Sequence, residues 1–209
     1  MKKLNITKIM IALAIMFNSF NYANANATPT IATTYISDLV HSISSLLNKK
    51  DLNPTNKNQQ LTEIFLTNVD TKWIGRFVMG KYWRSISASQ QEEYQNLFGK
   101  FLITNYLPYF KNYNANMVKI LSSKEISTNE HLVNTEITIA ESNNPIRLDY
   151  RIIKKPNTTQ FIIFDVVVEG VSLIATQRSE IDSIMSSGGF EKALSLIKQK
   201  TENASAKVN

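Results

Sequence analysis

Residues 161–178, FIIFDVVVEGVSLIATQR, constrain the fold more than any other part of the chain. The first eight of them are β-branched or aromatic except for Asp165, a composition typical of a strand. Because this segment is apolar on both sides, we expect it to lie centrally in a sheet. Alternation predicts two sets of inward and outward side chains: Ile162, Phe164, Val166 and Val168 on one side, and Phe161, Ile163 and Val167 on the other. The Glu169-Gly170 pair that follows predicts a bend.

Apolar residues also alternate with a period of two in three earlier segments, which predicts three more strands. These segments are residues 118–120, 133–139 and 146–152. Short connections that contain Asn and Pro, at 143–145 and 155–157, separate the last three of the four expected strands. Connections of this length favour an antiparallel meander.

Apolar residues recur at three- and four-residue intervals in the rest of the chain, which indicates helices. We expect helices around residues 31–47, 61–65, 71–80, 88–106, 177–187 and 190–200. The expected N-caps are Asp70, Ser87 and Thr176, and Gly80 and the pair 188–189 are expected to end helices. Pro108 should end the longest helix or kink it. Helices, then strands, then helices is an α+β pattern, in which helices pack on one face of a curved, mainly antiparallel four-stranded sheet.

The amino terminus has the features of a secretory signal. Three lysines, at positions 2, 3 and 8, precede the apolar run 9–17, and overlapping Ala-x-Ala sites follow at 23–27. The run is too short for a membrane-spanning helix, which needs about 20 apolar residues. We therefore expect residues 1–25 to be removed near Ala25 or Ala27, and the protein to be exported. The expected product is one domain, residues 26–200, with a disordered tail at 201–209.

Composition narrows the possible functions. The chain has no cysteine, so it has no disulfide, thiol nucleophile or Cys-based metal site. Its net charge of +6 includes the three signal lysines, which leaves +6 − 3 = +3 for the mature chain. The basic residues are scattered, which argues against nucleic acid as a partner.

Catalytic motifs are incomplete. Gly170-Val171-Ser172 begins like a hydrolase nucleophile elbow, but Ile174 stands where that motif needs glycine. His41 and His131 lie in contexts typical of surface residues. Arg147 and Arg151 flank Asp149, so ion pairing is favoured over an acid/base set of Asp149, Asp165 and Glu169. Neither a recognised metal-ligand spacing nor a Gly-rich phosphate loop is present in the sequence.

Four short motifs, in order and at consistent separations, resemble one known family. They are VD at 69–70, MGKYWR at 79–84, DYR at 149–151, and EGVSL at 169–173 followed by Arg178. Together they resemble the MlaC or toluene-tolerance (Ttg2D) family, the periplasmic phospholipid-binding component of the Mla lipid-transport system. The resemblance covers residues 31–200. It departs from the family pattern at Gly75 and at Thr176-Gln177-Arg178, which affects the expected shape of the pocket.

The resemblance implies a monomeric lipid shuttle, with no enzyme activity and no cofactor other than its phospholipid cargo. Its implied partners are an outer-membrane lipoprotein complex and an inner-membrane ABC transporter with a lipid-binding ring. Hiding the acyl tails is the physical requirement, since exposing a chain of about 16 carbons costs on the order of 12 kcal/mol. Two alternatives stay open: a hydrolase that uses Asp149 or Asp165, and a periplasmic chaperone that binds peptides along a sheet edge.

Inward periodicity and the resemblance together predict the residues of an apolar pocket. The expected lining is Trp73, Phe77, Phe98, Phe101, Tyr106, Ile137, Leu148, Tyr150, Val166, Val168 and Leu173. The expected rim or headgroup residues are Arg84, Gly170, Ser172 and Arg178. An ordinary filled core would produce the same apolar stripes, so periodicity alone does not separate a packed interior from a hollow one.

Overall fold

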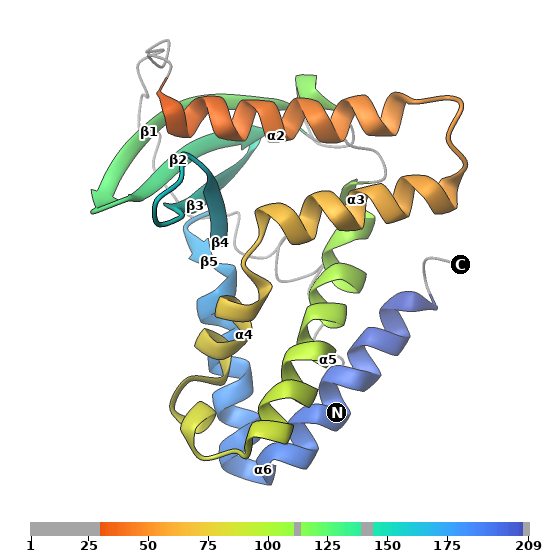
Figure 1. The fold of residues 1–209 in the computed structure, drawn as a ribbon, viewed down its shortest axis with the longest axis vertical. Helices are drawn as coiled ribbons and strands as arrows, with labels where there is room; N and C mark the ends of the chain where they lie inside the picture. The colour runs from red at the N-terminus through yellow and green to blue at the C-terminus, as the bar shows by residue number, and fades with distance from the viewer. Residues whose placement is uncertain (1–29, 111–113, 139–143, 207–209) are drawn as a thin grey trace.

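A computed structural model describes residues 30–110, 114–138 and 144–206 (Figure 1). The expected signal peptide lies outside these residues. The elements, in chain order, are α2 (Ile31–Asn48), α3 (Pro54–Asn68), α4 (Thr71–Met79), η1 (Gly80–Arg84), α5 (Ala88–Tyr106), η2 (Leu107–Phe110), η3 (Ala115–Met117), β1 (Val118–Ser127), β2 (Glu130–Ile137), β3 (Ile146–Lys154), β4 (Phe161–Val168), β5 (Val171–Ser172) and α6 (Leu173–Ser205). This order confirms the α+β prediction. The sheet and α2 form the upper part of the molecule in Figure 1, and α4, α5 and α6 form the lower part.

The sheet is an antiparallel meander with the order β1-β2-β3-β4-β5. It has one strand more than predicted, because the two residues of β5 turn back and pair with the end of β4. Glu169 and Gly170 form the connection, with φ values of 49° and 81°. Positive φ at both central residues suits a two-residue hairpin turn, and glycine adopts it without strain. The bend expected at Gly170 is therefore a tight turn.

A β-bulge in β4 overturns the predicted alternation of this strand. Ile152 pairs with Ile163, but Arg151 pairs with Asp165, so Phe164 is an extra residue in the ladder. Ile163 and Val166 consequently face the same side of the sheet, and Phe164 packs with the helices instead. The prediction that Phe164 and Val166 face the same side was wrong. It assumed strict alternation along the strand, and an alternating pattern does not reveal an inserted residue.

The helix ends show which local signals were reliable. Asp70 accepts a hydrogen bond from the Trp73 amide at 2.9 Å, and Ser87 forms the predicted capping box with Gln90. Gly80 ends α4 with a φ of 58°. The predicted cap at Thr176 is wrong, because α6 begins four residues earlier than predicted, at Leu173, with Ser172 as its N-cap. The second helix is longer than expected, since Asn53 caps it and Pro54 occupies its first turn.

Helix α6 reverses direction at Gly189, where φ is 71° and ψ is −170°. Its first half runs down from the sheet in Figure 1 and its second half returns alongside α5. An ion pair between Glu180 and Lys200 joins the two halves. The helix continues to Ser205, so most of the tail expected to be disordered is helical. Among the described helices, none is both long enough and apolar enough to span a bilayer.

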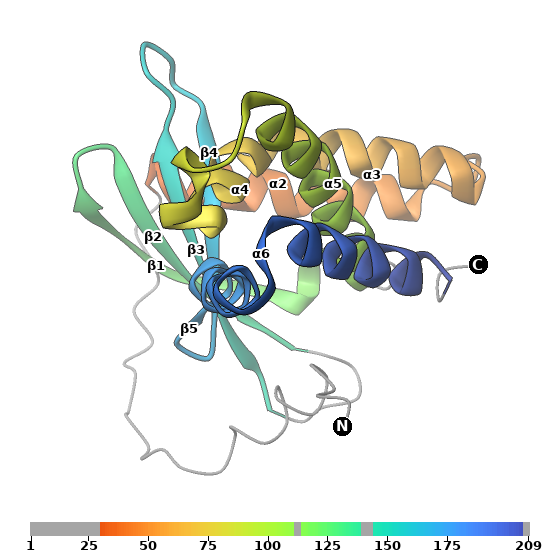
Figure 2. The ribbon, with the colours of Figure 1, turned by 90° about the horizontal axis from the view of Figure 1, so that it is seen from below.

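Seen from below, the helices gather largely on one side of the sheet (Figure 2). Two apolar clusters hold these parts together. The first, which we call the helical core, lies between α4, α5 and α6, with the bulge residue Phe164 added from β4. The second lies between α2 and the sheet. β4 contributes to both clusters, so it connects the upper and lower parts of the molecule.

Tyr94 lies at the centre of the helical core and provides a test of it. The residue is 0% exposed, and its hydroxyl has no hydrogen-bond partner among the described residues. An unsatisfied buried hydroxyl costs about 1–3 kcal/mol. We therefore expect Tyr94→Phe to raise the free energy of unfolding by about 1 kcal/mol, measured by urea denaturation. A decrease would mean that the hydroxyl has a bonding partner in solution.

Candidate functional site

One side of the sheet presents a mainly apolar surface, interrupted by Thr135 and His131, which we call the α2 face. The strand register places Leu148 opposite Val168 and Tyr150 opposite Val166. Ile137 lies on the same face two residues beyond Thr135, which pairs with Leu148. The structure thus brings five of the predicted lining residues together on one surface, namely Ile137, Leu148, Tyr150, Val166 and Val168.

Helix α2 covers part of this face and leaves part of it accessible. Ala32, Ile36 and Val40 pack against the sheet, and Tyr150 and Val166 belong to the same cluster. Ile137, Leu148 and Val168 lie outside this cluster and are only half-buried. The uncovered end of the α2 face is therefore an apolar strip in partial contact with solvent.

Two tyrosines of the predicted lining, one on the α2 face and one at the end of α5, have raised pKa values. Burial raises the pKa of Tyr150 to about 12, and burial is also the main cause of the raised pKa of Tyr106. Tyr106, at the end of α5, also hydrogen-bonds Gln177 of α6. Leu173, the first residue of α6, is half-buried.

The other predicted lining residues belong to the helical part of the molecule. Phe98 and Phe101 are 1% and 5% exposed and pack within the helical core. Trp73 and Phe77 stack with ring centroids 5.1 Å apart, and Trp73 contacts Phe164 edge-on. Trp73 is nevertheless 43% exposed. The structure thus divides the predicted set into a sheet group and a helical group, with Tyr106 packed against the helical core.

Two depressions among the described residues differ from the expected apolar pocket. One, of about 770 Å³, is an open groove between α2 and α3 lined mainly by polar residues such as His41, Lys49 and Glu63. The other, of about 10 Å³, lies between α5 and α6. Pockets that hold small-molecule ligands usually measure about 300–1,000 Å³ and are mostly apolar. Neither depression has both the size and the lining that an acyl chain needs.

Two of the four predicted rim residues, Arg178 and Ser172, have structural contacts of their own. The Arg178 guanidinium lies 4.8 Å from the centre of the Phe77 ring and packs against Gly80, where a Cβ would meet Arg178 Nε at 3.2 Å. Arg84 and Gly170 are exposed. Ser172 donates a hydrogen bond to Asp165 at 2.7 Å and accepts one from the Ala175 amide.

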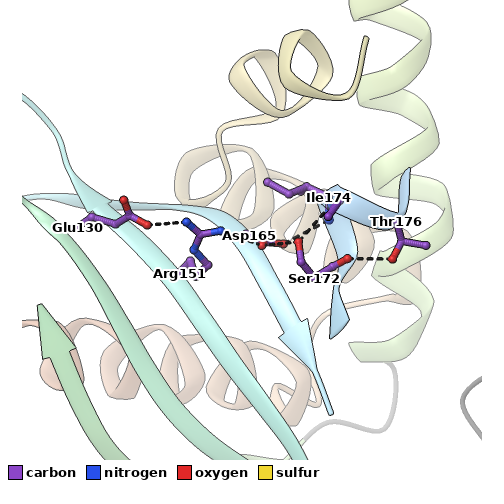
Figure 3. Close-up of polar contacts among 7 residues, drawn as sticks. Glu130, Arg151, Asp165, Ser172, Ile174 and Thr176 are labelled. Carbon is purple, nitrogen blue, oxygen red and sulfur yellow. Dashed lines mark hydrogen bonds and ion pairs between the residues drawn. The ribbon is translucent and has the colours of Figure 1, made fainter. Parts of the chain in front are cut away.

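A polar network crosses the opposite face of the sheet (Figure 3). Arg151 forms ion pairs with Glu130 at 2.7 Å and with Asp165 at 3.4 Å. Asp165, only 2% exposed, also accepts hydrogen bonds from the Ser172 hydroxyl and the Ile174 amide. The network therefore links β2, β3 and β4 to the start of α6.

The carboxylates considered for catalysis are engaged in this kind of pairing. Asp149 is bound by Arg147 at 3.0 Å, as the sequence indicated, whereas Arg151 pairs with Glu130 and Asp165. By register, both aspartates lie on the face opposite Leu148 and Val168. No described residues form a cluster of three or more potential metal ligands. The role of Glu130 could not be predicted from the sequence. Glu130 pairs with Arg151 across strands, and no local pattern around either residue marks the other as its partner.

Comparison with known proteins identifies the family. The model of the MlaC protein family matches residues 34–199, which is most of the chain. The chain belongs to the MlaC family. This confirms the resemblance drawn from the four motifs.

Two similar proteins agree with the assignment. A Haemophilus influenzae protein, the intermembrane phospholipid transport system binding protein MlaC, is 26% identical over 136 residues, or 64% of this chain. The match spans 63% of that relative's length. The fold also matches a phospholipid-binding protein from Ralstonia solanacearum, solved in complex with a phospholipid. That likeness covers 84% of this chain and 97% of the other, with a TM-score of 0.64 and 18% identity.

Replacing Asp165 should lower the stability of this MlaC-family chain more than replacing most other polar residues. We expect Asp165→Asn to lower the free energy of unfolding by about 2–3 kcal/mol, because it leaves Arg151 without its buried partner and weakens the α6 cap. Ser172→Ala should cost about 1 kcal/mol. The two losses should not be additive, since the residues share a hydrogen bond. Urea denaturation of both variants and the double variant measures this.

Asp182→Asn is a matched control. Asp182 pairs with Lys81 at 2.8 Å, but both side chains are at least half exposed, so its loss should change stability little. An Asp165→Asn variant as stable as this control would contradict a structural role for the network.

Proposed function

We propose that the chain is a soluble periplasmic phospholipid carrier that holds acyl tails against the α2 face of its sheet. Membership of the MlaC family carries this proposal. The name of the H. influenzae relative and the bound phospholipid of the R. solanacearum protein support it. The apolar strip on the sheet supplies a surface of suitable chemistry.

The composition of the α2 face suits hydrocarbon. Its central residues, Leu148, Tyr150, Val166 and Val168, offer aliphatic groups and one uncharged phenol ring. A tail placed there leaves water, and each CH₂ removed from water contributes about 0.8 kcal/mol. The headgroup would stay outside, because burying a charged phosphate without partners is costly. The protein should therefore select phospholipids by their acyl tails and accept different headgroups.

The packed interior means that loading requires part of the molecule to move. We propose that α2 moves away from the sheet, since its contacts with the sheet are mainly apolar and non-directional. Tails that replaced Ile36 and Val40 against the sheet would restore much of the lost burial. Among the described residues, four directional bonds hold α2 to other elements. Thr30 Oγ1 lies 2.7 Å from Ser123 Oγ, and Ser44 accepts from the Ala115 amide at 3.1 Å. On the α3 side, the Tyr35 hydroxyl donates to Asn68 at 2.9 Å and Lys57 donates to the Leu47 carbonyl at 2.8 Å.

Family membership also suggests the route. We propose that the monomeric protein moves lipid between an outer-membrane lipoprotein complex and an inner-membrane ABC transporter with a lipid-binding ring. Binding without catalysis is consistent with the paired carboxylates on the opposite face of the sheet.

Lipid content tests the carrier proposal directly. Protein purified without detergent should yield about one phospholipid or more per chain by mass spectrometry of the extract. Leu148→Lys should reduce that amount at least about tenfold, because an ammonium group on the α2 face penalises hydrocarbon nearby.

Ile153→Lys is the control, since Ile153 lies on the same strand, faces the opposite side and is 39% exposed. It should leave the lipid content unchanged. Equal loss in both variants would argue against the α2 face as the tail site. Co-purified polypeptide in place of lipid would favour the chaperone alternative.

A disulfide tests whether α2 must move. Thr30→Cys with Ser123→Cys would place two sulfurs within bonding reach, and the chain has no other cysteine to compete. We expect the oxidised, lipid-free double variant to take up phospholipid from vesicles far more slowly than the reduced form. Addition of a reductant should restore uptake. Equal uptake rates in both redox states would show that this end of α2 stays in place during loading.

A further inference from the structure

The segment around α4 is strongly basic. Between Thr71 and Arg84 the chain carries Lys72, Arg76, Lys81 and Arg84 and no acidic residue. All four cationic side chains are exposed. The α2 face, which concerns the cargo, includes none of these residues.

Aromatic rings lie among these charges. Trp73 is 43% exposed although it stacks on Phe77, and Arg178 of α6 covers the Phe77 ring at 4.8 Å. Positions three and four apart share one side of a helix, so Lys72, Arg76 and Trp73 are neighbours. We call Lys72, Trp73, Arg76, Phe77 and Arg178 the α4 surface.

The positive charge of this surface is not neutralised by nearby acids. Lys72 and Arg76 form no ion pair with any described residue, whereas Lys81 pairs with Asp182. The nearest acid in the sequence, Asp70, is occupied as the cap of α4. Lys72 and Arg76 are therefore available to an external anion.

We propose that the α4 surface docks the protein onto an anionic lipid bilayer. Each Lys or Arg near such a bilayer gains attraction from the negative surface potential. An exposed indole suits the membrane interface, where its ring meets the acyl boundary and its N–H stays hydrated. Trp73 stacks on Phe77 and contacts Phe164 edge-on, and 43% of its surface remains exposed to meet a bilayer.

A bilayer suits this surface better than an acidic protein does. Strong protein–protein contacts usually seat an aromatic anchor in a pocket. Neither depression described above includes an α4 residue. The α4 surface instead combines long cationic side chains with one exposed Trp. Binding through such groups does not require a pocket of complementary shape on the partner.

Vesicle sedimentation tests the proposal with the full mature chain. Binding should be strong to vesicles that contain phosphatidylglycerol, weak to pure phosphatidylcholine vesicles, and reduced by added salt. Each removed cation should weaken binding about fivefold, so Lys72→Gln with Arg76→Gln should weaken it about 25-fold. Lys49→Gln with Lys50→Gln removes the same charge from the turn between α2 and α3, on the other side of Figure 1, and should have little effect. Equal loss of binding in both double variants would overturn the proposal.

Fluorescence measures whether the indole enters the bilayer. The chain has two tryptophans, so Trp83→Phe leaves Trp73 as the only one. Vesicles of phosphatidylglycerol with brominated tails should quench its emission. The same measurement in a Leu148→Lys background separates docking from cargo uptake, because docking alone should persist there. Absence of quenching in that background would overturn the proposal, as would binding to polyglutamate without any binding to vesicles.

Discussion

The buried carboxylate of Asp165 is the interaction on which the arrangement of this molecule depends. It lies on the central part of β4, is almost fully buried, and binds both the N-cap hydroxyl and a first-turn amide of α6. An anion at a helix N-terminus is favoured by the helix dipole and by unpaired amides. Arg151 balances its charge and extends the connection to Glu130 on β2. Three strands and the first helix turn are thereby fixed relative to one another.

The bulge at Phe164 lets one strand contribute to two apolar clusters. An extra residue beside Asp165 keeps Ile163 and Val166 on the α2 face and releases Phe164 towards the helices. Without it, either the ionic pair or the apolar strip would lose its register, because a one-residue shift moves every later side chain to the other face. β4 thus presents apolar side chains on the α2 face and Asp165 on the opposite face. It also joins the upper and lower parts of the molecule through its two apolar clusters.

Local chemistry explains what the sequence predicted well. Caps such as Asp70 and Ser87 act within three residues, and a two-residue period follows directly from strand geometry. The bulge, the partners of Arg151 and the cap at Ser172 depend on which strands meet, and periodicity holds no such information. The helical stripe of Phe98 and Phe101 was assigned to a pocket for the same reason. A stripe shows that a side is buried, but not whether protein or lipid covers it.

The two sides of the sheet also differ in the kind of force that acts on them. Ion pairs and charge-assisted hydrogen bonds on the polar side are directional, so displacing a strand there breaks them outright. Contacts between α2 and the opposite face are mostly apolar, and another apolar group of similar area can replace them with little net change in free energy. A sheet held by directional bonds on one face and covered by an apolar helix on the other is the arrangement that the proposed loading of hydrocarbon requires. The same asymmetry makes a closely packed interior compatible with the proposed carrier function.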